Sequence, residues 1–378
     1  MESLIKREIQ SFIENHLFKG KIIIIYGARQ VGKTTLTKEI QKKFPNDSVY
    51  LNCDEPDIRD AFTDATSSSM KSFIGNKKLV FFDEAQRVEN IGLSLKLLID
   101  TYPDMQIIAT GSSSFDLSNQ ISEPLTGRKY EFLLYPFSIS ELLQVYSWQE
   151  IKRSIEQKVL LGMYPDVSQK GFEEAKELLR SLTQSYLYKD MLNFQNIKNP
   201  EILEKLLQAL ALQIGNEVSY NELANLLDID KKTVASYIQI LEKAFVVYRL
   251  KPLFKNGRKE ISKLRKIYFM DTGIRNALIN NFNGFNLRQD AGHLWENFLV
   301  SERIKHNNNT GKKINSYFWR SHTKQEIDYI EEEDSSFHGF EFKLKQKAFK
   351  IPKLFNELYP GAPIKLISQE NFNEFIIS

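Results

Sequence analysis

Short apolar runs recur along the first third of the chain, and each is followed by polar or glycine-containing sequence. The runs are unbroken rather than alternating, as in Ile22–Ile25 and Leu79–Phe82. Strands buried on both faces of a parallel sheet have this composition. Between the runs, residues 4–18 and the segment from Gly32 to about Phe44 place apolar residues at helical spacing. This pattern predicts an α/β domain, with further strands at 49–51, 106–109 and 130–134 and a helical stretch at 57–75 that breaks at Ser67–Ser69.

The middle of the chain reads differently. The segment after residue 136 is helical in pattern, with breaks near Gly162 and Pro165. Three further helices are predicted at 201–214, 220–227 and 231–243, and strand-like runs follow at 245–250 and up to Phe269. Asn256-Gly257 between these runs is a hairpin signal. Two helices joined by a short turn and followed by a hairpin predict a winged helix.

The segment from Gly27 to Thr34 fits the phosphate-binding pattern G-x-x-x-x-G-K-T. It follows a predicted strand and opens a predicted helix, whose unpaired N–H groups and dipole favour a triphosphate. Lys33 is expected to reach the β- and γ-phosphates, and the Thr34 hydroxyl to hold Mg²⁺. A chance match is the alternative. The predicted nucleotide-binding residues are Gly27, Ala28, Arg29, Gln30, Val31, Gly32, Lys33, Thr34 and Thr35.

Two acids, Asp83 and Glu84, end the apolar strand at 79–82. At the carboxyl end of a parallel strand, an acid lies beside bound phosphates and binds Mg²⁺ directly or through water. We therefore predict Asp83 as the Mg²⁺ residue and Glu84 as the general base that polarises the attacking water. The alternative is a pair of acids that favours the start of a helix.

Two further positions carry open alternatives. The hydroxyls from Thr110 to Ser113 follow another strand and either sense the γ-phosphate or cap a helix. Arg128, in the sequence Leu125-Thr-Gly-Arg128, is either an arginine finger for a neighbouring subunit's nucleotide or one half of a surface ion pair.

Composition limits the remaining classes. The chain has 378 residues, which is enough for two or three domains, and a net charge of +3, which does not by itself argue for nucleic acid. The single cysteine, Cys53, excludes a disulfide within one chain. No apolar run reaches the roughly 18 residues of a membrane span, and the N-terminus is not a secretory signal. We expect a cytoplasmic protein with no membrane partner.

The first part of the chain resembles the AAA+ ATPases. The motifs GARQVGKTT, LVFFDEAQ and IIATGSS occur in the order expected for that class, and with LTGR and YPFSISE they resemble one prokaryotic AAA+ group whose C-terminal domain has no known function. The resemblance implies ATP rather than GTP, with Mg²⁺, a parallel sheet flanked by helices, a lid over the nucleotide, and ring or dimer assembly. The expected domains are an AAA+ core at 1–136, a helical lid at 137–198, a winged helix at 199–275 and a nuclease-like domain at 276–378.

The predicted winged helix has features of a DNA reader. The recognition helix would begin with Lys231, Lys232 and Thr233 and expose Ser236, Tyr237 and Gln239, residue types that contact phosphates and base edges. From Lys251 to Arg275 there are eight Lys or Arg residues against two acids, and Arg258 and Lys259 lie beside the expected wing tip. Such a patch attracts a polyanion. A protein-binding module is the alternative.

The last hundred residues contain a second candidate site. Helix 292–303 carries Glu296, and strand-like segments at 317–319, 326–330 and 339–344 carry Asp328, Glu341 and Lys343. Acids on adjacent strands, a lysine and a helix acid are able to hold Mg²⁺ against a phosphodiester. The arrangement resembles the PD-(D/E)XK, or restriction-endonuclease-like, fold, although Ile327 stands where that pattern has proline. The alternatives are a nuclease fold without activity and ordinary charge alternation on a half-buried sheet.

The sequence thus favours an ATP hydrolase that drives a DNA-binding, nuclease-like C-terminal half. The second hypothesis is a nucleotide-gated switch or scaffold whose C-terminal half binds a protein, and the third is an active metal-dependent nuclease.

Overall fold

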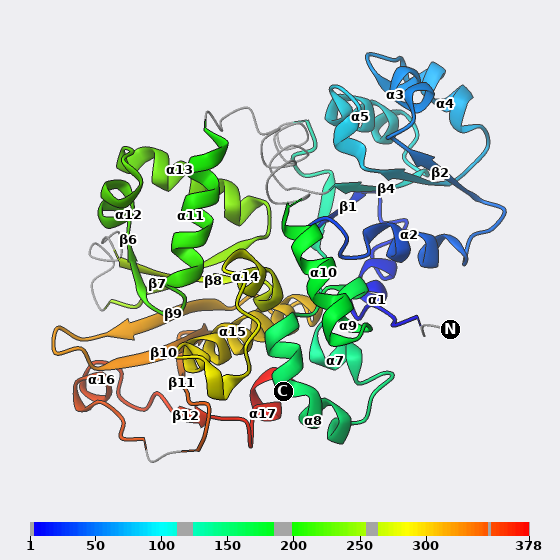
Figure 1. The fold of residues 1–378 in the computed structure, drawn as a ribbon. Helices are drawn as coiled ribbons and strands as arrows, with labels where there is room; N and C mark the ends of the chain where they lie inside the picture. The colour runs from blue at the N-terminus through cyan, green and yellow to red at the C-terminus, as the bar shows by residue number, and fades with distance from the viewer. Residues whose placement is uncertain (1–3, 112–123, 185–198, 255–263, 347–348, 378) are drawn as a thin grey trace. The chain divides into compact units, whose positions relative to one another are not determined.

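The computed structural model describes residues 4–111, 124–184, 199–254, 264–346 and 349–377 (Figure 1). The chain forms two compact units. We call Lys6–Pro136 with Lys243–Phe245 the N-terminal unit, and Phe137–Glu242 and Val246–Ser378 with Met1–Ile5 the C-terminal unit. The segments predicted as lid, winged helix and nuclease-like domain all fall within the C-terminal unit, and their subdivision stays a prediction.

The N-terminal unit is built on a parallel sheet of five strands in the order β2-β3-β4-β1-β5. Its strands are β1 (Ile22–Tyr26), β2 (Ser48–Asn52), β3 (Leu79–Asp83), β4 (Gln106–Gly111) and β5 (Lys129–Leu133). Every residue of β1, β3 and β4 is buried, because helices cover both faces of the sheet. The unbroken apolar runs therefore predicted the parallel sheet correctly.

Helices of the N-terminal unit lie on both faces of this sheet, with α1 and α2 on one face and α3, α4 and α5 on the other (Figure 1). Their bounds are α1 (Ile9–Glu14), α2 (Lys33–Gln41), α3 (Pro56–Phe62), α4 (Ser67–Ile74) and α5 (Ile91–Thr101). The first helix is shorter than the predicted 4–18. The break predicted at Ser67–Ser69 was misplaced, because the Thr66 hydroxyl accepts a hydrogen bond from the Ser69 amide and starts α4 there.

The C-terminal unit begins with the predicted helical segment. Its helices are α7 (Ile139–Leu142), α8 (Trp148–Leu161), α9 (Pro165–Ser168) and α10 (Phe172–Leu182). The break at Gly162 is confirmed, and Gly162 has a positive φ of 73°. A Cβ there would lie 2.0 Å from the carboxylate of Asp271, which accepts hydrogen bonds from the amides of Met163, Gly273 and Ile274. Asp271 thus caps the helix that follows it and also holds the end of α8.

The next segment contains the predicted pair of helices and strands. Its elements are α11 (Pro200–Leu212), β6 (Glu217–Ser219), α12 (Tyr220–Leu227), α13 (Lys231–Lys243), β7 (Val247–Pro252) and β8 (Leu264–Phe269). Strand β8 pairs antiparallel with both β6 and β7. One assignment was wrong: Tyr237 is 3% exposed and not on the surface. The Asn256-Gly257 hairpin signal lies outside the described residues.

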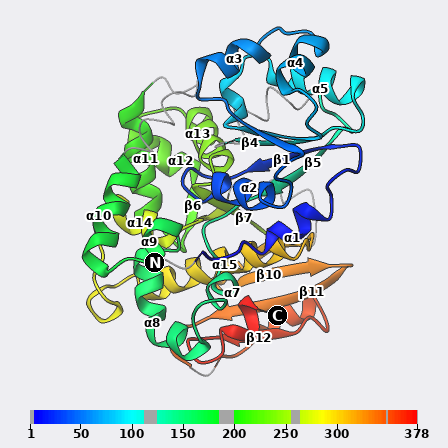
Figure 2. The same ribbon diagram turned by 90° about the vertical axis from the view of Figure 1, so that its right-hand side faces the viewer.

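The rest of the unit extends the same sheet. Its elements are α14 (Thr272–Leu278), α15 (Ala291–Asn309), β9 (Asn315–Arg320), β10 (Glu326–Glu333), β11 (Ser336–Phe342), α16 (Lys353–Leu358), β12 (Ile364–Ile367) and α17 (Asn373–Ile376). Strand β9 pairs with β10 and also, in parallel, with β7, so one seven-stranded sheet runs β12-β11-β10-β9-β7-β8-β6. Helix α15 runs beside β10 and buries Trp295 and Phe298 in the core (Figure 2). Of the described helices, none has the length and apolar character to cross a membrane.

Candidate functional site

The loop between β1 and α2 has a backbone path that only glycine permits at two points. A Cβ at Gly27 would lie 2.3 Å from the carbonyl oxygen of Leu134. Gly32 has φ 94° and is the N-cap of α2, without a side chain that caps the first amides of the helix. Those N–H groups therefore stay available for an anion. The glycines of the motif are explained by close approach at one position and by left-handed backbone at the other.

Lys33 is buried and folds back over this loop. Its ammonium donates to the carbonyl oxygens of Gly27 and Ala28, both at 3.0 Å, and lies 3.9 Å from Glu84 Oε1. Burial lowers the pKa of Lys33, and the nearby carboxylates of Glu84 and Asp83 oppose that shift. The ammonium is thus held at the loop where the sequence predicted phosphate contacts.

Asp83 receives hydrogen bonds from three hydroxyls. Thr34 Oγ1 donates to Oδ2 at 2.8 Å, Thr110 Oγ1 donates to Oδ1 at 2.5 Å, and the Tyr50 hydroxyl donates to Oδ2. The structure therefore brings together Thr34 and Asp83, the two residues predicted to hold Mg²⁺. Sequence reasoning missed Tyr50. Its only signal was that the strand at 49–51 precedes the acidic strand, which it turns out to neighbour.

Glu84 follows β3 with a left-handed backbone, φ 52°. Its amide donates to Thr110 Oγ1 at 3.1 Å, and Gln86 Nε2 donates to its Oε2 at 2.5 Å. The Glu84 side chain does not cap the short 3-10 helix Ala85–Arg87 that begins here. The Thr110 hydroxyl bridges the two acids. The residues that it would cap, including Ser112 and Ser113, lie outside the described residues, so the capping alternative stays open. The geometry is that of a fixed pair of acids.

Arg7 is a second residue of this region that the sequence did not single out. Its guanidinium donates to the carbonyl oxygens of Val31 and Tyr135, each at 2.6 Å. Arg7 therefore ties the phosphate-loop backbone to the chain just beyond β5. Its place in a helical pattern gave no signal of this contact.

Arg128 lies at the other end of the sheet from the loop. It precedes β5, which runs parallel to β1 with Lys129 beside Ile22. The loop follows the far end of β1, roughly 17 Å away at about 3.3 Å per residue. Arg128 Nε donates to Asp100 at 2.7 Å, and both side chains are about two-fifths exposed (41% and 43%). Arg128 is therefore too far from the phosphate loop of its own chain to contact a nucleotide there. Its assignment as an arginine finger for a neighbouring subunit stays a prediction.

The predicted recognition helix α13 begins with a strong cap. Asp230 accepts hydrogen bonds from the amides of Lys232 and Thr233, at 2.7 and 3.0 Å, and from the Thr233 hydroxyl. Lys231 and Lys232 are exposed, as are Ser236 and Gln239. The Thr233 hydroxyl is instead engaged by the cap.

The predicted basic patch is weaker than its composition indicated. Lys266 and Arg275 are buried in ion pairs with acids, and Arg265 lies 4.4 Å above the ring of Tyr220. Arg258 and Lys259 lie outside the described residues. Counting charges along a strand overlooked that alternate side chains point inward.

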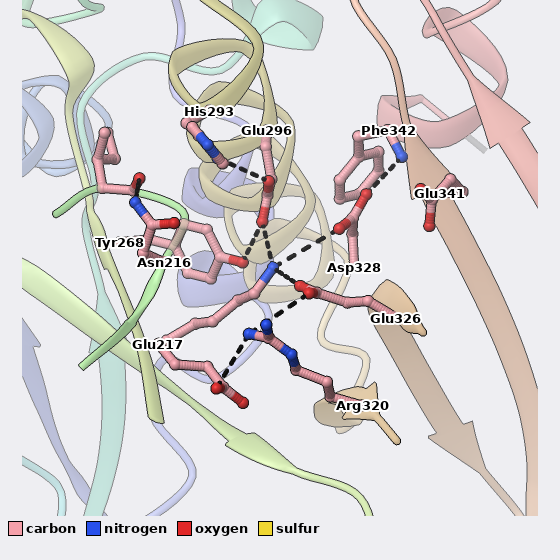
Figure 3. A network of polar contacts seen from close by, with 12 residues as sticks. Asn216, Glu217, Tyr268, His293, Glu296, Arg320, Glu326, Asp328, Glu341 and Phe342 are labelled. Carbon is pink, nitrogen blue, oxygen red and sulfur yellow. Dashed lines mark hydrogen bonds and ion pairs between the residues drawn. The ribbon is translucent and has the colours of Figure 1, made fainter. Parts of the chain in front are cut away.

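The four predicted nuclease-like residues lie on neighbouring elements, and a fifth residue lies among them. Lys266, on β8, contacts Glu296 Oε1 at 2.9 Å, Asp328 Oδ1 at 3.6 Å, and Glu326. Figure 3 shows the carboxylates of Glu296, Asp328 and Glu326 converging, with Glu341 to one side. Glu341 Oε1 instead accepts from Lys343 at 2.6 Å. No sequence pattern placed Lys266 at this site.

The charges of this cluster shift one another. Burial opposes ionisation of Glu296, but Lys266, His293 and Tyr268 lower its pKa to about 2. Burial, with repulsion from Glu296, raises the pKa of Asp328 well above its ordinary value. Burial also raises the pKa of Glu341, and Lys343 opposes that shift. Within the described ranges, no group of three or more His, Cys, Asp or Glu residues is arranged to hold a metal ion.

Comparison with known proteins assigns the first unit. Residues 19–143 match the AAA domain family. The N-terminal unit carries an AAA domain. This match and the parallel sheet support nucleotide binding by a P-loop ATPase. The AAA family generally binds ATP with Mg²⁺. Residues 152–284 and 291–371 match two families that are each described as a domain of unknown function, DUF8612 and DUF4143.

Two relatives that match most of this chain are each described as an uncharacterized protein. The uncharacterized protein MJ1544 of Methanocaldococcus jannaschii is 29% identical over 310 residues, which are 77% of this chain and 68% of that protein. The uncharacterized protein Rv2008c of Mycobacterium tuberculosis is 26% identical over 346 residues, which are 89% of this chain and 74% of that protein. A Drosophila ORC structure bound to AT-rich DNA and Cdc6 aligns with 72% of this chain and 92% of that chain at 10% identity, but its TM-score of 0.25 is too low to establish a shared fold.

Proposed function

We propose that the chain binds and hydrolyses ATP in its AAA domain and couples nucleotide state to a DNA-binding, nuclease-like C-terminal region. The observation that carries the first half is the convergence of Thr34, Asp83 and Glu84 behind a glycine-dependent loop. Such a loop with an acid pair beside it suits a nucleoside triphosphate and its metal.

The residues present are suited to Mg²⁺. The hydroxyl of Thr34 and the carboxylate of Asp83 are the hard oxygen ligands that this ion prefers. Bound there, Mg²⁺ would neutralise charge on the phosphates. Tyr50 and Thr110 hold the Asp83 carboxylate from two sides, so that it need not reorganise.

Glu84 has the position and partners of a general base. Gln86 and the Thr110 hydroxyl fix its side chain and its amide, and the Lys33 ammonium lies 3.9 Å from its carboxylate. A carboxylate held in this way is suited to orient and polarise a water molecule.

The DNA half of the proposal rests on the arrangement of α11 to β8. Three helices, a short turn and a strand pair that β6 extends support a winged helix. Lys231 and Lys232 lie exposed at the start of α13, where a recognition helix contacts DNA. Acids on α15, β10 and β11 support a nuclease-like arrangement beside it.

A second candidate function is a nucleotide-gated switch or scaffold whose C-terminal half binds a protein and does not cut DNA. The observation that favours it is the burial of Lys266 and Arg275 in ion pairs, which removes them from any DNA-facing surface.

One set of measurements tests both candidates. ATP binding and hydrolysis are measured for the parent, Lys33→Ala and Glu84→Gln, with and without duplex DNA. We expect Lys33→Ala to lose ATP binding and Glu84→Gln to bind ATP without turnover. Hydrolysis by Glu84→Gln at the parental rate would refute the base assignment. A DNA affinity that falls with salt and with Lys231→Ala/Lys232→Ala supports the DNA reader, whereas no affinity at moderate salt supports the scaffold.

A further inference from the structure

The C-terminal acids surround a lysine that belongs to a different part of the fold. Lys266 lies on β8, the strand that ends the proposed winged helix, and its side chain is 2% exposed. The carboxylates that it contacts come from α15 (Glu296) and β10 (Glu326 and Asp328). These three elements therefore meet at one buried ammonium.

We propose that the Lys266 ammonium serves as the cation of this acid cluster in place of a divalent metal, and that the cluster fastens β8 to α15 and β10 without cutting nucleic acid. The proposal does not rest on ATP hydrolysis or on DNA binding, and it holds for either candidate function.

The charge balance supports an internal cation. Buried carboxylates are costly unless a positive charge and hydrogen bonds compensate them. Lys266 supplies that charge, and the Tyr268 hydroxyl also donates to Glu296 Oε1 at 2.6 Å. At the edge of the cluster, Arg320 Nη1 lies 3.0 Å from Glu217 and 3.8 Å from Glu326 (Figure 3). Two cations of the chain itself, Lys266 and Arg320, thus offset part of the negative charge of these acids.

A metal among these acids would have to displace the lysine. A divalent ion binds carboxylate oxygens at about 2.0–2.6 Å. Lys266 Nζ already lies 2.9 Å from Glu296 and 3.6 Å from Asp328, so a metal that shared both carboxylates would lie next to a like charge. Asp328 Oδ2 is also engaged, because it accepts from the Phe342 amide at 2.9 Å.

Neighbouring contacts show what the cluster fastens. Asn297, the residue after Glu296 on α15, pairs with both backbone groups of Phe269 on β8, each at 2.7 Å. Arg320 on β9 reaches Glu217 on β6 across the same sheet. Helix α15 therefore holds β8 through a side-chain ion pair and two hydrogen bonds from the Asn297 side chain to the Phe269 backbone, all buried.

The first measurement uses the parent protein and needs no variant to fold. Mn²⁺ binding to the nucleotide-free protein is titrated by electron paramagnetic resonance, beside Asp328→Asn and Glu341→Ala. We expect the parent and both variants to bind the same amount of Mn²⁺. We also expect the parent not to cleave plasmid DNA in the presence of Mn²⁺. Mn²⁺ binding by the parent that either substitution abolishes would overturn the proposal, as would DNA cleavage that Glu341→Ala abolishes.

The second measurement removes the lysine. Lys266→Met keeps most of the chain length and removes the charge, and Lys343→Met is the matched control, because Lys343 pairs with Glu341 at a half-exposed position. In calorimetry we expect Lys266→Met to lower the unfolding temperature of the C-terminal unit by about 10 °C and Lys343→Met to lower it much less. Mn²⁺ should raise the unfolding temperature of Lys266→Met but not that of the parent.

Two outcomes of that series contradict the proposal. If Lys266→Met and Lys343→Met lowered the unfolding temperature equally, Lys266 would contribute no more than an ordinary half-exposed lysine. If Mn²⁺ did not raise the unfolding temperature of a folded Lys266→Met, removal of the ammonium would not have opened a cation site. If Lys266→Met does not fold, Lys266→Met/Glu296→Gln replaces it. That variant removes charge from both partners and should recover part of the loss, and the proposal fails if it recovers none.

Discussion

Glycine 27 gives a direct test of the phosphate-loop geometry. In Gly27→Ala the new Cβ would lie 2.3 Å from the Leu134 carbonyl oxygen and 3.1 Å from Val31 Cγ2. The closer neighbour is backbone and has no rotamer to change. Ordinary contacts begin at 3.4 Å, so the loop and the end of β5 must separate by about 1 Å in a tightly packed core.

The cost of that separation follows from packing. Forcing an extra methyl into a filled site costs about 1–3 kcal/mol. In a unit of this size, each kcal/mol lowers the unfolding temperature by about 4 °C. A loop displaced by about 1 Å should also weaken ATP binding by at least about tenfold, because its amides no longer match the phosphates.

Two matched glycines separate steric clash from backbone strain. Gly32→Ala meets no atom closer than 3.7 Å but must keep φ 94°, and Gly20→Ala meets nothing within 4 Å but must keep φ 68°. The left-handed backbone costs alanine roughly 1–2 kcal/mol in each. All three variants should therefore unfold at lower temperature, while only Gly27→Ala and Gly32→Ala should lose ATP affinity.

Calorimetry and titration with a fluorescent ATP analogue measure the two effects. Parental ATP affinity in Gly27→Ala would refute the argument that close approach to Leu134 shapes the loop. Weakened binding in Gly20→Ala would show that the assay reports general destabilisation instead.

Two further predictions concern the acids. Thr110→Val keeps side-chain shape but removes the hydroxyl between Asp83 and Glu84, so kcat for ATP should fall at least about tenfold with little change in ATP affinity; Tyr50→Phe, which frees only Asp83, should lower kcat less, and equal effects would contradict the bridging role. Glu296 has a pKa lowered to about 2, so its ion pair stabilises the fold above its unfolded pKa of 4.5 and loses that effect as pH falls toward 2. The difference in unfolding temperature between parent and Glu296→Gln should shrink over that interval, and a constant difference would contradict the assignment.

The apolar pattern predicted the first sheet because every strand of its centre is buried on both faces. Runs such as Ile22–Ile25 leave no alternative to burial, and the motif residues follow them at the carboxyl edge of the sheet. Local sequence was therefore sufficient to predict that Thr34 and Asp83 lie close together. It did not reveal Tyr50 or Arg7, because their partners are set by strand order and by chain far away in sequence.

Pattern reasoning was weaker in the C-terminal unit, where strands are mixed and charged residues such as Lys266 and Glu296 are buried in ion pairs. Tyr237 lies on the inner face of α13 and not on the outer face, because the two faces of an amphipathic helix differ by only a residue or two in register. The three-residue β6 was not predicted, since it carries too few positions to show alternation.

Lys266 shows why a motif match alone does not decide chemistry. The four residues resemble the nuclease pattern in sequence alone, and that resemblance would have been the same had position 266 held any other residue. Whether the acids bind a metal depends on the Lys266 ammonium, which β8 places between Glu296 and Asp328. The spacing of residues within 296–343 contains no information about this lysine. Without Lys266, these acids could bind a metal ion; here they bind the lysine ammonium. Because buried carboxylates need a compensating positive charge, a metal could enter only if the ammonium left.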